Sequence, residues 1–147
     1  MSYKNDLYQR VILDHNRNPR NYRRLSEATD SCDGKNPLCG DELTIFLELD
    51  GEVIRDISFT GSGCAISKAS ASLMTGYVKG KTVDEFKASF DKFQKMVKGE
   101  TDDNLADLGK LSVLAGVKEY SSRVKCATLA WHTASCAIEK NKATTTE

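Results

Sequence analysis

The stretch DELTIFLELDGEVIRDISF, residues 41–59, decides the fold. Large apolar residues fall at every second position in its first half, and a second set follows in its last seven residues. Alternate side chains of a β-strand face the same way, so each half is typical of a strand with one buried face. Asp50-Gly51 lies between the halves and is a strong turn signal. We therefore expect an antiparallel hairpin.

The register of this hairpin follows from parity. The two sets that we expect to face inward occupy odd positions, namely Leu43, Ile45, Leu47 and Leu49 in the first half and Val53, Ile57 and Phe59 in the second. A two-residue turn at Asp50-Gly51 would pair odd with even positions and send the two sets to opposite faces of the sheet. We therefore expect a three-residue loop that ends at Gly51, with this glycine in the left-handed conformation as a bulge. The predicted hairpin opposes Leu47 to Val53 and Leu43 to Ile57.

Helical patterns surround the hairpin. Apolar residues recur at helical spacing over about 5–15, 65–79, 102–117 and 123–139, and Thr82 with Glu85 forms a capping box that opens a further helix to about residue 99. We expect Trp131 and the phenylalanines of that capped helix to lie in the core. The polar region 22–38 is expected to hold at most one short strand, at about 25–31. Two or three antiparallel strands followed by helices indicate an α+β fold.

Composition points to one soluble domain. A chain of 147 residues with 39% hydrophobic content is expected to form a single domain over 1–140, followed by a disordered polar tail, 141–147. Lysine plus arginine (21) balances aspartate plus glutamate (21), so no overall field favours nucleic acid or an anionic membrane. No apolar run approaches the roughly 20 residues that span a bilayer. We expect a cytoplasmic protein.

The five cysteines are poor disulfide candidates in a reducing compartment, and their odd number weakens a paired framework further. Metal binding or thiol chemistry is the better interpretation. Cys32 lies in a polar region without a companion, and Cys136 lies nearly three helical turns beyond Cys126. We therefore expect no site role for Cys32 or Cys136.

The other three cysteines each lie where irregular chain meets a regular element. Cys39 precedes the first strand of the hairpin, and Gly40 lets a thiolate and the Asp41 carboxylate face one point; zinc accepts both ligand types. Cys64 and Cys126 lie at predicted helix N-termini, which favour the thiolate. Their wide separation matches no local zinc signature. The residues alone leave open whether they share a metal ion or are separate buried side chains.

Three motifs carry a family resemblance: Asn36-Pro37-Leu38-Cys39-Gly40-Asp41, Gly61-Ser62-Gly63-Cys64-Ala65-Ile66-Ser67 and Arg123-Val124-Lys125-Cys126-Ala127-Thr128-Leu129-Ala130-Trp131. In this order they resemble the SufU branch of the IscU/NifU N-terminal family of iron-sulfur cluster assembly proteins. The resemblance implies a SufE/NifU-like α+β fold with a small three-stranded antiparallel sheet packed against about five helices. It also implies Zn²⁺ held by Cys39, Asp41, Cys64 and Cys126.

Two departures choose the branch within this family. IscU-type proteins carry a histidine immediately before their third cysteine and a Leu-Pro-Pro-Val-Lys segment recognised by a chaperone. This chain has Lys125 before Cys126, and residues 120–124 read Tyr-Ser-Ser-Arg-Val. Residues 90–117 resemble the insertion of the SufU branch, which favours the same choice.

The resemblance implies a function in sulfur transfer. The residue matching Cys39 accepts persulfide sulfur from a PLP-dependent cysteine desulfurase of the SufS type, stimulates that enzyme, and passes the sulfur to a downstream iron-sulfur scaffold. Alternatives are a scaffold that holds a [2Fe-2S] cluster and a purely structural zinc domain. Arg123 and Lys125 are candidates for partner docking or for steadying the persulfide, against an interpretation as solvated charges. A hydrolytic zinc enzyme is disfavoured because four protein ligands leave no position for water.

Overall fold

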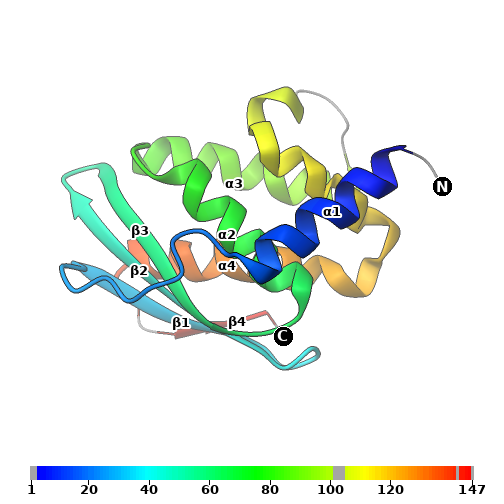
Figure 1. Cartoon of the computed structure of the whole chain (residues 1–147). Helices are drawn as coiled ribbons and strands as arrows, with labels where there is room; N and C mark the ends of the chain where they lie inside the picture. The colour runs from blue at the N-terminus through cyan, green and yellow to red at the C-terminus, as the bar shows by residue number, and fades with distance from the viewer. Residues whose placement is uncertain (1–2, 101–104, 142, 147) are drawn as a thin grey trace.

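The expected hairpin forms one half of a mixed four-stranded sheet (Figure 1). The computed structural model describes residues 3–100, 105–141 and 143–146. Within these ranges the chain order is α1 (Tyr3–Arg17), β1 (Asp30–Asn36), β2 (Asp41–Asp50), β3 (Val53–Ser62), α2 (Ala65–Val78), α3 (Val83–Val97), the 3-10 helices η1 (Leu105–Glu119) and η2 (Ser121–Arg123), α4 (Val124–Ile138) and β4 (Ala143–Thr145). The α+β class is confirmed.

The sheet differs from the three-stranded antiparallel sheet that we expected. Its order is β3-β2-β1-β4, and β4 runs parallel to β1. The tail predicted to be disordered supplies this strand, because β1 has a free edge on which Ala143 pairs with Asp33 and Thr145 with Lys35. β1 itself begins at Asp30, later than the short strand expected at 25–31. Its polar, glycine-containing sequence carries little strand signal.

The hairpin accommodates the extra residue at a different place from the one predicted. Gly51 and Glu52 form a two-residue loop between the paired residues Asp50 and Val53, and a bulge lies between Glu48 and Leu49. The extra residue therefore lies inside the strand pair rather than in the loop. Leu43, Ile45, Leu47, Ile57 and Phe59 are buried as expected, but the inward position predicted for Val53 was wrong: Val53 is exposed, and Ile54, which pairs with Leu49, is buried in its place. The predicted pairing was also wrong, because Leu47 pairs with Ile57 and Leu43 pairs with Gly61. The left-handed conformation expected for Gly51 is confirmed by its φ of 60°.

Helices cover one face of the sheet (Figure 1). α4 packs on β1 and β2, α2 packs on β3 and α4, and α1 packs on α2. The expected capping box of Thr82 and Glu85 opens α3. The rings of Phe86, Phe90 and Phe93 stack on buried Trp131 of α4, as the aromatic pattern predicted. No helix in the described ranges is long and apolar enough to cross a membrane.

The helix expected at 102–117 is only partly recovered. Residues 102–104 lie outside the described part of the chain. Leu105–Glu119 form the 3-10 helix η1, which is interrupted where Gly109 adopts a φ of 54°. Glycine can adopt this conformation without a side-chain clash, so the chain changes direction here. The leucine spacing predicted helical backbone correctly but not its type.

A close seam joins β1 to α4. Every second residue of β1, from Cys32 through Gly34 to Asn36, is buried. A Cβ atom added at Gly34 would lie 1.9 Å from Thr133 Oγ1 on α4, so the Thr133 side chain packs directly against the backbone of β1. This seam is what sets the distance between the end of β1 and the beginning of α4.

Cys32 and Cys136 form a disulfide across this seam, which contradicts the expectation that the cysteines are poor disulfide partners. Their Cα atoms lie 6.0 Å apart, within the usual range for a disulfide, although 104 positions separate them in sequence. The sequence-based argument placed Cys32 in a loop. In the structure it lies on the face of β1 that meets α4, a contact that spacing along the chain does not reveal.

We predict that Gly34→Ala destabilises the protein by about 1–3 kcal/mol, the usual range for an overpacked site. Rotation of Thr133 offers little relief, because its Cβ and Cγ2 atoms also lie 3.0 and 3.1 Å from the new methyl group. The free energy of unfolding is measured by urea denaturation. The control is Gly76→Ala in α2, where nothing lies within 4 Å of the added carbon and helix propensity improves. An unchanged midpoint for Gly34→Ala would refute the close seam.

Candidate metal centre

The turn between β1 and β2 carries the first two candidate ligands. The backbone amide of Cys39 donates to the carbonyl of Asn36 at 3.3 Å, and Gly40 then adopts a left-handed φ of 70°. This tight reversal places Asp41 as the first residue of β2, where it is buried. The Cys-Gly-Asp spacing thus brings a thiol and a carboxylate to the same end of the sheet, as the sequence predicted.

The other two candidate ligands lie at helix N-termini. Cys64 is the N-cap residue of α2, and its Sγ accepts a hydrogen bond from the backbone amide of Ser67 at 3.4 Å. Cys126 lies in the first turn of α4 and is fully buried. The two positions expected at helix starts are therefore found there, and both face the turn that carries Cys39.

The four side chains converge although they come from distant parts of the sequence. One ligand atom each from Cys39, Asp41 and Cys126 lies within 4.8 Å of the other two. The Sγ atoms of Cys39 and Cys126 are 3.1 Å apart, and the Sγ of Cys64 lies 4.0 Å from Asp41 Oδ2. Cys39, Asp41 and Cys126 thus share one small volume, whereas Cys64 lies beside it in contact with Asp41 and is not part of that group of three.

This donor set fits a metal ion. Zinc-thiolate bonds of about 2.3 Å in tetrahedral geometry place neighbouring ligand atoms roughly 3.8 Å apart, so the observed spacings need only small adjustments. Thiolates with one hard oxygen are a set that zinc accepts. Soft thiolates also suit iron-sulfur clusters, so the donor chemistry admits both occupants.

Two further residues hold Asp41 in place. Asn36 is fully buried, and its Nδ2 donates to Asp41 Oδ2 at 3.2 Å and to Cys126 Sγ at 3.4 Å. The backbone amide of Cys64 donates to Asp41 Oδ1 at 2.8 Å. Gly63 permits this approach, because a Cβ atom there would lie 2.6 Å from Asp41 Oδ1. The carboxylate is therefore oriented from both sides before any metal binds.

The contact of Asn36 with the candidate ligands was not predicted from the sequence. An asparagine before a proline is typical of a turn, and nothing in its sequence spacing indicates that its amide reaches a cysteine 90 positions away. Its place within the first family motif was the one available signal.

Electrostatic coupling within the cluster shifts the pKa values of Cys64 and Cys126 in opposite directions. In the structure Cys126 Sγ donates to Cys39 Sγ at 3.1 Å, and its interaction with Cys64 lowers the pKa of Cys64 to about 6. The same interaction, together with burial, raises the pKa of Cys126. Hydrogen bonding to Cys126 and the nearby sulfur charges raise the pKa of Arg123. One thiolate thus forms readily, and further ionisation requires a compensating positive charge.

The two candidate docking residues differ in their contact with the site. Arg123 is exposed, and its Nη1 donates to Cys39 Sγ at 3.6 Å. Lys125 is also exposed, but in the described residues it makes no hydrogen bond to any of the four candidate ligands. The guanidinium therefore belongs to the immediate surroundings of Cys39, whereas Lys125 contributes only surface charge beside it.

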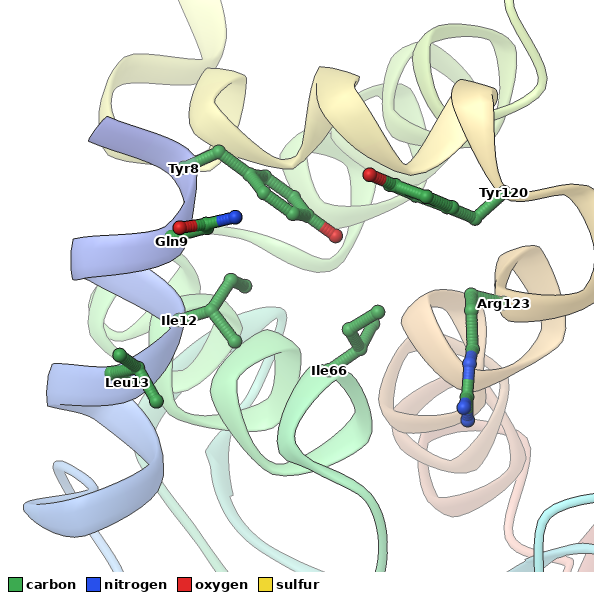
Figure 2. Close-up of a pocket in the computed structure, with 7 residues that line it drawn as sticks. All are labelled: Tyr8, Gln9, Ile12, Leu13, Ile66, Tyr120 and Arg123. Atoms are coloured by element: carbon green, nitrogen blue, oxygen red, sulfur yellow. The ribbon is translucent and has the colours of Figure 1, made fainter. Parts of the chain in front are cut away.

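A groove of about 480 Å³ adjoins the cluster (Figure 2). Figure 2 shows the rings of Tyr8 and Tyr120 along one side and Ile12 and Ile66 along the other, with Arg123 at one end. Most of its lining is apolar. None of the candidate ligands lines the groove, and the link between the two is Arg123, which lines the groove and contacts Cys39.

The fold and the cluster together define a small α+β protein with a cysteine-aspartate site that can hold a metal ion. The chain belongs to the NifU-like N-terminal domain family, whose model matches residues 7–127. The family resemblance noted in the sequence is thereby confirmed.

Similar proteins include both branches of the family. The zinc-dependent sulfurtransferase SufU of Bacillus subtilis is 42% identical over 93% of this chain and 90% of its own length. The iron-sulfur cluster assembly scaffold protein IscU of Streptococcus pyogenes is 38% identical over 96% of this chain and 88% of its own. A crystal structure of a candidate scaffold protein for the SUF system from Fervidobacterium islandicum matches with a TM-score of 0.84 and 34% identity, covering 90% of this chain and 97% of that one.

We predict that Asn36→Asp weakens metal binding by about 10- to 100-fold, the usual effect of removing a group that orients a metal ligand. The new carboxylate lacks the donor that contacts Asp41 and Cys126, and it adds negative charge to the cluster. Affinity is measured by competition with a chromophoric zinc chelator. Asn16→Asp in α1 makes the same chemical change away from the cluster and should bind as the native protein does. Equal affinities for the two variants would contradict the role of Asn36.

We predict that Cys64 of the metal-free protein is alkylated with a pH midpoint near 6. Its pKa is lowered, so the reactive thiolate predominates above that pH and is lost on acidification through it. The rate at Cys64 is followed by peptide mass spectrometry. In Cys126→Ala the interaction that lowers this pKa is gone, and the midpoint should move to higher pH. A midpoint that stays near 6 in this variant would show that Cys126 is not the cause.

Proposed function

We propose that this chain is a zinc-dependent sulfur acceptor that takes persulfide sulfur from a cysteine desulfurase for iron-sulfur cluster assembly. Cys39, Asp41, Cys64 and Cys126 are the proposed zinc ligands. The observation that carries the proposal is the convergence of Cys39, Asp41 and Cys126 at one end of the sheet, with Cys64 beside Asp41. The similarity to a relative named zinc-dependent sulfurtransferase, over nearly the full chain, supports it.

Bound zinc would keep the thiols ionised near neutral pH, which the coupled protons otherwise oppose. Among the sulfurs, Cys39 is best placed to react. It lies on a surface turn and is partly exposed, whereas Cys126 is buried and Cys64 is held at the N-cap of α2. A metal-bound thiolate is a weak nucleophile, so we expect Cys39 to leave the metal when the partner docks. The remaining three ligands keep the two helix starts and β2 together.

The proposed reaction is a thiol-persulfide exchange. The Cys39 thiolate attacks the terminal sulfur of the persulfide on the desulfurase cysteine. The bond between the two persulfide sulfurs breaks, and its electron pair leaves with the enzyme's cysteine as a thiolate. Cys39 then carries the persulfide, and no external oxidant or reductant is needed. The Arg123 guanidinium, 3.6 Å from Cys39 Sγ, is placed to stabilise the anionic persulfide.

The proposed partner is a PLP-dependent cysteine desulfurase of the SufS type, and the recipient of the sulfur is a downstream iron-sulfur scaffold. We assign Arg123 and Lys125, with the adjoining groove, to docking of the desulfurase segment that presents the persulfide. The groove supports this assignment because it is mostly apolar and is lined at one end by Arg123, which contacts Cys39. An apolar segment next to an anionic persulfide matches an apolar groove that ends in an arginine.

A second candidate is the scaffold on which a [2Fe-2S] cluster is built and passed on. The 38% identity to relatives named IscU scaffold proteins favours it. Metal analysis together with the absorption spectrum separates the two, because a zinc protein is colourless and a cluster absorbs visible light. Iron and acid-labile sulfide in protein isolated without oxygen would favour the scaffold.

We predict that Cys39→Ser abolishes stimulation of the desulfurase, because oxygen cannot take over the sulfur as a thiolate does. Stimulation is measured as the rate of sulfide release from cysteine in the presence of a dithiol. Far-ultraviolet circular dichroism checks that the variant is folded. The control Lys87→Ala, on the exposed side of α3, should stimulate normally. Normal stimulation by Cys39→Ser, or failure to detect a persulfide on Cys39 of the native protein by mass spectrometry, would refute the acceptor role.

A further inference from the structure

The Cys32–Cys136 disulfide lies on the same two elements that form the candidate metal centre. Asn36, at the end of β1, contacts Cys126 at the beginning of α4. Four residues earlier on β1, Cys32 is bonded to Cys136, ten residues further along α4. The strand and the helix are thus joined covalently at one end of the seam and by the Asn36 hydrogen bond at the other.

A second pocket gives access to this disulfide. It encloses about 180 Å³ and is lined by Cys136 together with polar residues that include His132, Ser135, Glu139 and Asn141. Cys136 is 6% exposed, whereas Cys32 is 1% exposed and does not line the pocket. A small polar thiol therefore meets Cys136 first.

We propose that Cys32 and Cys136 form a second, redox-active sulfur site, which a small thiol or dithiol opens from the pocket at Cys136. The state of this pair sets how firmly β1 is held against α4 and, through Asn36, how long the metal centre retains its ion. The second part rests on the proposed metal site, whereas the reactivity of the pair does not.

The exchange chemistry balances without a further reactant. A thiolate of an external dithiol attacks Cys136 Sγ, forms a mixed disulfide and releases Cys32 as a thiolate, which takes up a proton. The second thiolate of the dithiol then attacks the other sulfur of the same dithiol, which is bonded to Cys136 in the mixed disulfide. Cys136 leaves as a thiolate, which is protonated in turn. Two electrons pass from the dithiol to the protein pair. The dithiol leaves as a cyclic disulfide.

The coupling to the metal centre follows from what remains after reduction. The ion pair of Lys140 with Asp30 is solvent-exposed on the lysine side, and such pairs contribute little. The Gly34–Thr133 contact depends on close approach, which the disulfide helps to hold. Four strand residues span only about 13 Å, so a change in the freedom of Cys32 reaches Asn36 along a stiff segment. Loss of the Asn36 hydrogen bonds removes one of the contacts that position Asp41 and one of those that position Cys126.

The first experiment measures zinc release. Zinc-loaded protein with the pair oxidised is compared with protein reduced by dithiothreitol and then desalted without oxygen, using a chromophoric chelator. We expect release to be about fivefold faster or more from the reduced form, which is the lower end of usual coupling between sites. The Cys32→Ser/Cys136→Ser double variant should release zinc at the rate of the reduced protein, with or without prior reduction. Equal rates for the oxidised and reduced proteins would overturn the coupling.

A second experiment needs no metal. Amide hydrogen exchange of the metal-free protein should be faster in β1 and in the first turn of α4 when the pair is reduced, with α3 as the internal reference. Unchanged exchange in β1 would overturn the coupling even if the chain proved not to bind zinc.

The third experiment tests the reactivity of the pair itself. Dithiothreitol should reduce Cys32 and Cys136 in the folded protein without denaturant, and oxidised glutathione should attach to Cys136 in the Cys32→Ser variant. Reduction that occurs only with unfolding, or the absence of glutathione from Cys136, would overturn the assignment.

Discussion

The main physical constraint on this end of the molecule is the mutual repulsion that arises when three neighbouring thiols and one carboxylate are all ionised. Interaction with Cys126 lowers the pKa of Cys64, and the same interaction raises the pKa of Cys126. A bound cation removes this conflict by attracting all four groups at once. The buried amide of Asn36 and the guanidinium of Arg123 supply only partial positive charge. The cluster is therefore best satisfied when it holds a metal.

The end of the sheet and the N-termini of two helices meet at this site. The turn after β1 delivers Cys39 and Asp41, and the N-termini of α2 and α4 deliver Cys64 and Cys126. Those elements are held by ordinary packing, with α4 lying across β1 and β2. Cys39 lies on a surface turn and is partly exposed, as Cys64 is at the N-cap of α2, whereas Cys126 is buried. The candidate ligands thus differ in their access to a partner.

Much of this arrangement could be predicted from sequence, and the exceptions have physical causes. Apolar periodicity and the capping box located the helices, and parity required the two apolar sets of the hairpin to share a face. Parity alone does not distinguish a bulge in the strand pair from a longer loop as the position of the extra residue. The hydrogen bonds of Asn36, the parallel strand β4 and the Cys32–Cys136 disulfide all join segments far apart in the chain. Local sequence patterns do not indicate contacts between such distant segments.

X-ray absorption at the zinc edge tests the central claim most directly, because it reports the atoms bound to the ion itself. Protein purified without chelators should contain one zinc per chain, with three sulfur neighbours at about 2.3 Å and one oxygen at about 2.0–2.2 Å. A first shell with fewer than three sulfurs, or zinc surrounded by oxygen and nitrogen alone, would contradict a centre formed by Cys39, Asp41, Cys64 and Cys126.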